Sequence, residues 1–197
     1  TTILTVLPQF TVAISPTGPI TICNGSTTQL TLLGVANPNF SYQWSDATGT
    51  ISGATTSSYT VSSSGTYSLE VTNSNGCAAT SNAVIVNIIT VATPGSLSTS
   101  NIMLDRATMN WAAVANANHY DVRLREQGGS WSILGNILTT SKTKYNLSSA
   151  TTYEWQVRSA CSADSSSVSA WSATETFSTL TPCTVPTNPT VANITPS

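Results

Sequence analysis

The chain has 197 residues, of which 40% are hydrophobic and only 7% are charged, and its formal net charge is -2. Globular domains usually carry about 25% charged residues, whereas this chain has 34 threonines and 30 serines, close to a third of its length. Its six Lys and Arg residues are too few for a basic patch that binds nucleic acid. No apolar run approaches the roughly 18 residues that span a bilayer, and no signal peptide is recognisable. The composition predicts a soluble, secreted chain with a hydroxyl-rich surface, no nucleic-acid partner and no membrane insertion.

The charges divide the chain into two parts. Residues 1–91 contain no Lys or Arg and only the acids Asp46 and Glu70, and all six basic residues follow. Short runs of Val, Ile, Thr, Tyr and Trp alternate with Gly, Asn, Ser and Pro clusters, and no stretch repeats apolar residues at helical spacing. The sequence therefore predicts an all-β chain of two β-sandwich domains in tandem, which meet near residues 90–94.

Alternating apolar residues predict the strands of the first domain. In chain order, the clearest predicted strands are Gln29–Leu33, Phe40–Ser45, Tyr59–Val61, Ser64–Val71 and Ala83–Ile88. Leu32 and Trp44 are expected to face one core. Asn75 and Gly76 are a favoured hairpin pair, so they predict the turn before the last strand.

This strand order resembles an immunoglobulin-like domain over residues 8–91. Trp44 matches the core tryptophan of that fold, and Tyr67 matches its tyrosine corner. Leu32 and Leu69 stand where antibody domains have their core disulfide. Four phrases are similar to Ig-like repeats of large surface and secreted proteins of Bacteroidota, which are often exported by the type IX system: Ile22–Ser26, Tyr42–Trp44, Ile51–Thr55 and Thr72–Cys77. The resemblance implies a secreted or cell-surface repeat protein.

Beyond the junction, the predicted strands 120–125 and 153–158 each have one apolar and one charged face. This part resembles a fibronectin type III domain, whose strand-B tryptophan matches Trp111. The Leu-x-Pro-x-Thr-x-Tyr corner of that family is matched by Leu147, Thr151 and Tyr153, with Ser149 in place of the proline. The second domain is therefore assigned to residues 92–181.

Arginines gather on the charged face of this second domain. Arg123 and Arg125 alternate on one predicted strand, and Arg158 lies on the strand expected beside it. Trp171 can stack on one of them, similar to the tryptophan–arginine ladders of cytokine-receptor type III domains, where an exposed contact stabilises by about 0.5–1 kcal/mol. Two interpretations stay open: a solvated face held by cross-strand pairs, and a ligand-binding face to which Trp131 in a nearby loop would contribute.

Both ends of the chain resemble parts of neighbouring repeats. Residues 182–197 repeat, 92 positions later, the Pro and Asn-Ile spacing that opens the second domain, which predicts the start of a further type III-like repeat. Residues 1–7 resemble the chain's own strand Ala83–Ile88, and we expect them to be the last strand of a preceding repeat. Because an apolar strand without a partner favours edge pairing, residues 1–7 are predicted to pair with a neighbouring domain or chain.

Four cysteines, an even set for a secreted chain, allow three disulfide connectivities. Cys23 and Cys77 share a domain, which favours their pairing, although the strand order places them at opposite ends of the sandwich. The same objection applies to Cys161 with Cys183. Related type III repeats place a cysteine just before the domain together with one at the end of strand F, and Val91 stands at that first position here. In the alternative that this resemblance implies, Cys161 reaches Cys23 across the domain junction or stays free.

The sequence offers no catalytic or metal-binding set. There is no Cys-x-x-Cys pair, and the single histidine, His119, is predicted to be a half-buried structural residue. Neither a Ser-His-Asp set nor a pair of carboxylates in a cleft can be identified. No enzyme activity and no cofactor are therefore expected.

The predicted function is that of a non-catalytic structural or adhesive module, acting as stalk or fibre subunit of an extracellular or cell-surface repeat protein. Its expected partners are neighbouring domains or chains of the same protein. An alternative of a different class is an accessory glycan-binding region of a secreted carbohydrate-active enzyme. In that alternative, Trp131 and Trp171 would contact the sugar.

Overall fold

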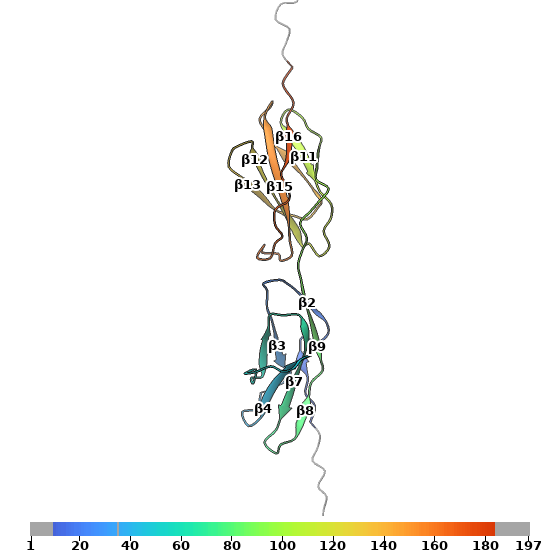
Figure 1. Ribbon diagram of the computed structural model, residues 1–197, viewed down its shortest axis with the longest axis vertical. Helices are drawn as coiled ribbons and strands as arrows, with labels where there is room; N and C mark the ends of the chain where they lie inside the picture. The colour runs from blue at the N-terminus through green and yellow to red at the C-terminus, as the bar shows by residue number, and fades with distance from the viewer. Residues whose placement is uncertain (1–9, 35, 184–197) are drawn as a thin grey trace, which may run out of the picture. The chain divides into compact units, whose positions relative to one another are not determined.

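The computed structural model describes residues 10–34 and 36–183, which form two compact units. Unit 1 consists of residues 10–91 and 164–168, and unit 2 of residues 92–163 and 169–183. Every regular element in these ranges is a β-strand, which confirms the all-β prediction (Figure 1). The described residues contain no helix that is long and apolar enough to cross a membrane. The predictions for residues 1–7, and for all but the first two residues of 182–197, lie outside the described residues.

Unit 1 contains two sheets. Its nine strands are β1 (Ile14–Ser15), β2 (Ile20–Cys23), β3 (Thr28–Leu32), β4 (Ser41–Asp46), β5 (Gly49–Thr50), β6 (Ser58–Val61), β7 (Gly65–Thr72), β8 (Ala78–Thr80) and β9 (Val84–Ile89). One sheet has the order β1-β3-β6, and the other has the order β2-β9-β7-β4-β5 with β8 beside β7. Strand β2 runs parallel to β9, whereas the other pairs are antiparallel. The five strands that the sequence predicts here are found within one residue of their predicted bounds.

Trp44 lies in the core of unit 1, where its side chain is fully buried among residues of both sheets. Its indole Nε1 donates a hydrogen bond of 2.9 Å to the carbonyl oxygen of Thr56, so the ring is buried without an unpaired donor. Leu69 is also fully buried, as the alternation on β7 predicts. Leu32 packs against this core but is only partly buried, and Leu30, on the same face of β3, is the fully buried leucine.

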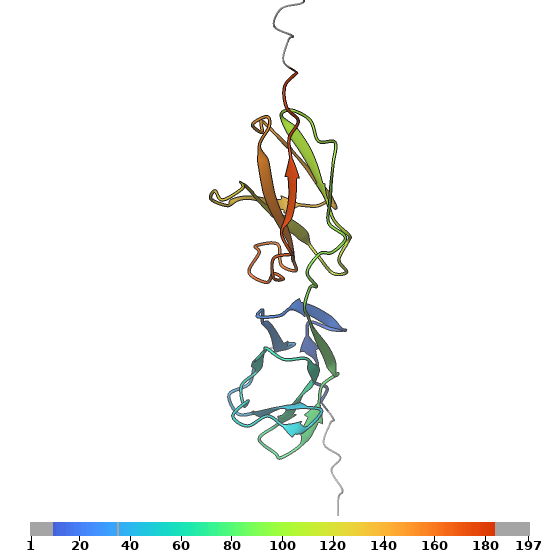
Figure 2. The same ribbon diagram turned by 45° about the horizontal axis from the view of Figure 1, so that its top comes forward.

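Unit 2 contains a three-stranded and a four-stranded sheet, in the orders β10-β11-β14 and β13-β12-β15-β16. Its strands are β10 (Ser98–Ser100), β11 (Arg106–Asn110), β12 (His119–Glu126), β13 (Ser132–Ile137), β14 (Ser141–Tyr145), β15 (Thr152–Ala160) and β16 (Glu175–Ser178). In the turned view of Figure 2, β16 (red) runs beside β15 (orange). The core between the sheets contains Trp155, fully buried, and Trp111, which is 5% exposed. Their ring centroids lie 6.4 Å apart.

In each unit, a tyrosine near the start of a long central strand bonds to the chain that precedes the strand. The hydroxyl of Tyr67 donates a hydrogen bond of 2.9 Å to the carbonyl oxygen of Ser63. In unit 2, the hydroxyl of Tyr153 accepts a hydrogen bond of 2.9 Å from the backbone N–H of Ser148. Both residues are the ones that the sequence predicts as tyrosine corners, and both are buried.

Leu69→Ala is predicted to destabilise unit 1 by about 2–5 kcal/mol, because a fully buried leucine leaves a cavity when it is truncated. Leu33→Ala, at a side chain that is 52% exposed, is the matched control and should change the free energy of unfolding by less than about 0.5 kcal/mol. Urea unfolding followed by circular dichroism measures both. Equal effects of the two substitutions would contradict the placement of the core.

Candidate functional site

Five side chains on one face of unit 2 form the arginine–tryptophan stack (Arg123, Arg125, Trp131, Arg158 and Trp171). Arg123 and Arg125 point to the same side of β12 because they are two residues apart, and Arg158 comes from the neighbouring strand β15. Trp131 directly precedes the edge strand β13, and Trp171 lies in the segment before the other edge strand, β16. The structure thus brings together all five residues that the sequence singles out as a ladder or ligand face.

The guanidinium groups and indole rings alternate along the stack. Arg125 lies 4.2 Å from the ring centroid of Trp131. Arg123 lies 4.5 Å from the Trp131 ring and 4.6 Å from the Trp171 ring, and Arg158 lies 4.6 Å from the Trp171 ring. All four distances are within the roughly 6 Å range of a cation–π contact. Because Arg123 contacts both rings, it is the shared centre of the stack.

Each arginine of the stack is also held by an acceptor on the neighbouring strand. The three pairs lie directly opposite each other on β12 and β15: Arg125 with Glu154, Arg123 with Gln156, and Arg158 with Asp121. The hydrogen bonds from Nε measure 2.6 Å to Glu154 Oε2, 2.6 Å to Gln156 Oε1 and 3.1 Å to Asp121 Oδ2. These bonds fix the planes of the guanidinium groups on which the indole rings stack.

The central arginine differs from the other two because its partner is neutral. Burial, together with the charges of Arg125 and Arg158, lowers the pKa of Arg123 from its ordinary value. Gln156 accepts from Arg123 through its oxygen, while its Nε2 donates to the carbonyl oxygen of Ser172 at 2.9 Å and to Thr174 Oγ1 at 3.0 Å. The amide therefore links the centre of the stack to the segment that carries Trp171.

Two serines hold that segment against β15. Ser169 Oγ accepts a hydrogen bond from the backbone N–H of Ser159 at 3.1 Å, and Ser172 Oγ accepts one from the N–H of Val157 at 3.0 Å. The backbone N–H groups of the same two serines donate back to the carbonyl oxygens of Ser159 and Val157. This role of the two serines is not predicted from the sequence, although their positions on either side of Ala170 and Trp171 are a visible signal of it.

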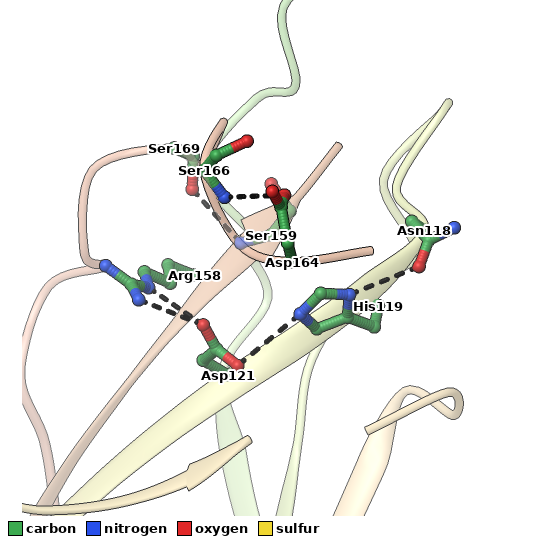
Figure 3. A network of polar contacts seen from close by, with 8 residues as sticks. All are labelled: Asn118, His119, Asp121, Arg158, Ser159, Asp164, Ser166 and Ser169. Atoms are coloured by element: carbon green, nitrogen blue, oxygen red, sulfur yellow. Dashed lines mark hydrogen bonds and ion pairs between the residues drawn. The ribbon is translucent and has the colours of Figure 1, made fainter. Parts of the chain in front are cut away.

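A polar network continues from the stack into the start of β12 (Figure 3). Asp121 accepts from Arg158 through Oδ2, and its Oδ1 lies 3.6 Å from Nε2 of His119. His119 Nδ1 lies 3.2 Å from Oδ1 of Asn118. His119 is 2% exposed, so the prediction of a half-buried residue is wrong: the ring is almost completely enclosed at the start of β12. Groups of three or more His, Cys, Asp or Glu side chains that could hold a metal ion do not occur among the described residues.

Cys23 and Cys161 are disulfide-bonded, whereas Cys77 and Cys183 are free thiols. The pairing of Cys23 with Cys77 that a shared domain favours is therefore wrong, and so is the pairing of Cys161 with Cys183. The reason within unit 1 is strand direction. Cys23 ends β2 beside the end of β9, and Cys77 follows the end of β7, which runs antiparallel to β9 and so ends at the opposite pole.

Comparisons with known proteins support the fold. No family model and no curated protein sequence matches the chain. Among solved structures, domains A168–A170 of titin match with a TM-score of 0.60 at 17% identity, covering 86% of this chain and 66% of the titin segment. The FN1–FN3 domains of chicken CNTN1 match with a TM-score of 0.47 at 16% identity, covering 86% of this chain and 65% of that one. A segment of two fibronectin type III domains from chicken tenascin matches with a TM-score of 0.43 at 17% identity, covering 78% and 92%. The chain spans just under two thirds of the titin and CNTN1 segments.

The strand orders and the titin likeness together define the class of protein. The chain is a tandem of β-sandwich modules. Unit 1, with its buried tryptophan and tyrosine corner, has the immunoglobulin-like fold, and unit 2, with three strands facing four, has the fibronectin type III fold.

Trp131→Ala is predicted to lower the free energy of unfolding of unit 2 by about 1–2 kcal/mol, because it removes two guanidinium contacts of about 0.5–1 kcal/mol each. Leu138→Ala is the matched control, since Leu138 follows the other end of β13 and is 79% exposed. Urea unfolding of the two variants is compared with that of the wild type. The stack does not stabilise unit 2 if both variants unfold at the same urea concentration.

Alkylation in denaturant without reductant is predicted to label Cys77 and Cys183 completely, because both are free thiols. Cys23 and Cys161 should react only after reduction. Peptide mass spectrometry reads the label at each cysteine. Protection of Cys77 in the unreduced, unfolded chain would contradict this assignment.

Proposed function

We propose that the chain is a non-catalytic structural module of an extracellular or cell-surface repeat protein, acting as stalk or fibre subunit. This proposal rests on one observation: the charged and aromatic side chains of the arginine–tryptophan stack bind one another. The three arginines of the stack contact two indole rings, two carboxylates and one amide of the same sandwich. Such groups hold strands together, and their contacts leave little of them to act on a substrate.

The contacts of the stack suit a mechanical role because they join different strands. Trp131 lies at one edge of the four-stranded sheet, Trp171 lies at the other, and the arginines of β12 and β15 lie between them. The three arginines stand at successive levels along β12 and β15, so the stack runs along the strands while its two rings come from either side of them. Separating β12 from β15 or from β13 breaks contacts of the stack in addition to backbone hydrogen bonds.

We propose further that the parent protein is a large secreted or surface protein of the Bacteroidota type, exported by the type IX system. The four phrases of unit 1 that resemble Ig-like repeats support this origin. The disulfide-bonded cysteines fit an oxidising compartment outside the cytosol. An antibody against the chain is expected to label the outside of intact cells of the source organism.

The alternative, a glycan-binding accessory region, needs an aromatic ring on which a sugar can stack. Trp131 carries the guanidinium groups of Arg123 and Arg125 over its ring, and Trp171 carries those of Arg123 and Arg158. A sugar would have to displace an arginine that is already held by its partner on the neighbouring strand. This competition favours the structural role over the glycan-binding one.

Polysaccharide pull-down separates the two roles. The structural role predicts that the wild-type chain, Trp131→Ala and the control Leu138→Ala are equally absent from the bound fraction, and that electron micrographs of the native assembly show filaments or stalks. Retention of the wild type and of Leu138→Ala, with loss of retention in Trp131→Ala, would establish the glycan-binding role instead.

A further inference from the structure

Strand β8 of unit 1 is an open sheet edge. It pairs with β7 through Thr72–Ala78, Val71–Ala79 and Glu70–Thr80, and no described strand pairs with its other side. Strand β2 covers the same edge of the sheet further along, and among the described strands it pairs only with β9. Figure 1 shows β8 beside β7.

The backbone groups of β8 alternate between the two sides of the strand. Next to β8, the N–H of Ser81 donates to the carbonyl oxygen of Leu69, and the N–H of Asn73 donates to that of Cys77, each at 2.9 Å. The odd-numbered residues of this stretch therefore face β7. It follows that Ala78 and Thr80 direct their N–H and C=O groups outward, where the described residues offer them no hydrogen-bond partner.

A hollow of about 490 Å³ lies beside this edge. Its lining consists of Phe10, Thr11, Val12, Glu70 and β8. Phe10 and Val12 are half-buried and pack against the core of unit 1, and the ring of Phe10 lies 5.9 Å from that of Phe40. The alanines of β8 add little volume. The hollow thus places the apolar side chains of Phe10 and Val12 beside outward-facing backbone groups, which is a combination that accepts an added β-strand.

We propose that β8 accepts the segment Thr2–Leu7 of a second copy of this chain as an added strand. The segment reads Thr-Ile-Leu-Thr-Val-Leu, so each of its two faces carries two large apolar residues and a threonine. Its backbone would pair with the outward groups of Ala78 and Thr80 while alternate side chains fill the hollow. It carries no charged side chain, so Glu70 meets no like charge.

A second copy is favoured over the chain's own segment because of Pro8. Only Pro8 and Gln9 separate Leu7 from Phe10. A two-residue hairpin needs positive φ at its first loop residue, and proline is fixed near -65°. Pro8 thus disfavours the commonest tight hairpin back towards Phe10–Val12, and we take a neighbouring copy as the acceptor. The inference is independent of the mechanical role, since it concerns unit 1 alone.

Complementary variants test the proposal, all in a Cys183→Ser background so that the exposed thiol cannot link copies. Deletion of residues 1–7 removes the donor strand. Thr80→Pro removes an outward N–H that the sheet does not use, and so blocks the acceptor edge while unit 1 stays folded. Thr80→Val keeps the N–H and is the matched control. Sedimentation velocity is expected to show association of the wild type and of Thr80→Val, monomers for each blocked variant alone, and a twofold mass when the two blocked variants are mixed.

Amide hydrogen exchange separates the second copy from other occupants. Protection of Ala78 and Thr80 should rise with protein concentration in the wild type and be lost in the deletion variant, with unchanged exchange at Leu69. Protection that is independent of concentration would show that the chain's own segment occupies the edge and would overturn the proposal. A wild type that stays monomeric, or an equimolar mixture of the blocked variants that does, would overturn it as well.

Discussion

Burial of every second strand residue against an aromatic core is the constraint on which the rest of this structure depends. A chain with 7% charged residues cannot rely on surface ion pairs, so its stability comes from side chains such as Trp44, Trp155 and Leu69, which are fully buried. The outward positions then need only to be polar, and serine and threonine meet that need while favouring strands or turns. The many serines and threonines thus occupy the solvent-facing positions of the alternating strands.

Because charge is scarce in this chain, the arginine–tryptophan stack holds a large share of it. Half of the six basic residues of the chain lie in it. Each contact contributes about 0.5–1 kcal/mol, far less than the core, but the contacts act between strands and at the edges of the sheet. A neutral partner, Gln156, at the centre keeps a third carboxylate out of the stack and links it to the segment of Trp171.

The sequence predicts what depends on local alternation and fails where distant segments meet. The strands follow from alternating apolar residues, the two tyrosine corners follow from the resemblance to the two folds, and the arginines of the stack follow from the alternation along β12 and β15. The order of stacking does not, because it depends on how the loops before β13 and β16 return to the sheet. The favoured pairing of Cys23 with Cys77 is wrong because strand direction, and not a shared domain, decides which cysteines lie at the same pole. The burial of His119 and the open edge of β8 depend on neighbours that no local pattern specifies.

The central claim is that Arg123 couples the two edges of the sheet through both rings. A double-mutant cycle of Arg123→Gln and Trp171→Ala, read as free energies of unfolding of unit 2, tests it most directly. The expected coupling energy is about 0.5–1 kcal/mol in favour of the native pair. Strictly additive effects of the two substitutions would contradict the claim and leave the stack as side chains that lie together without holding the strands.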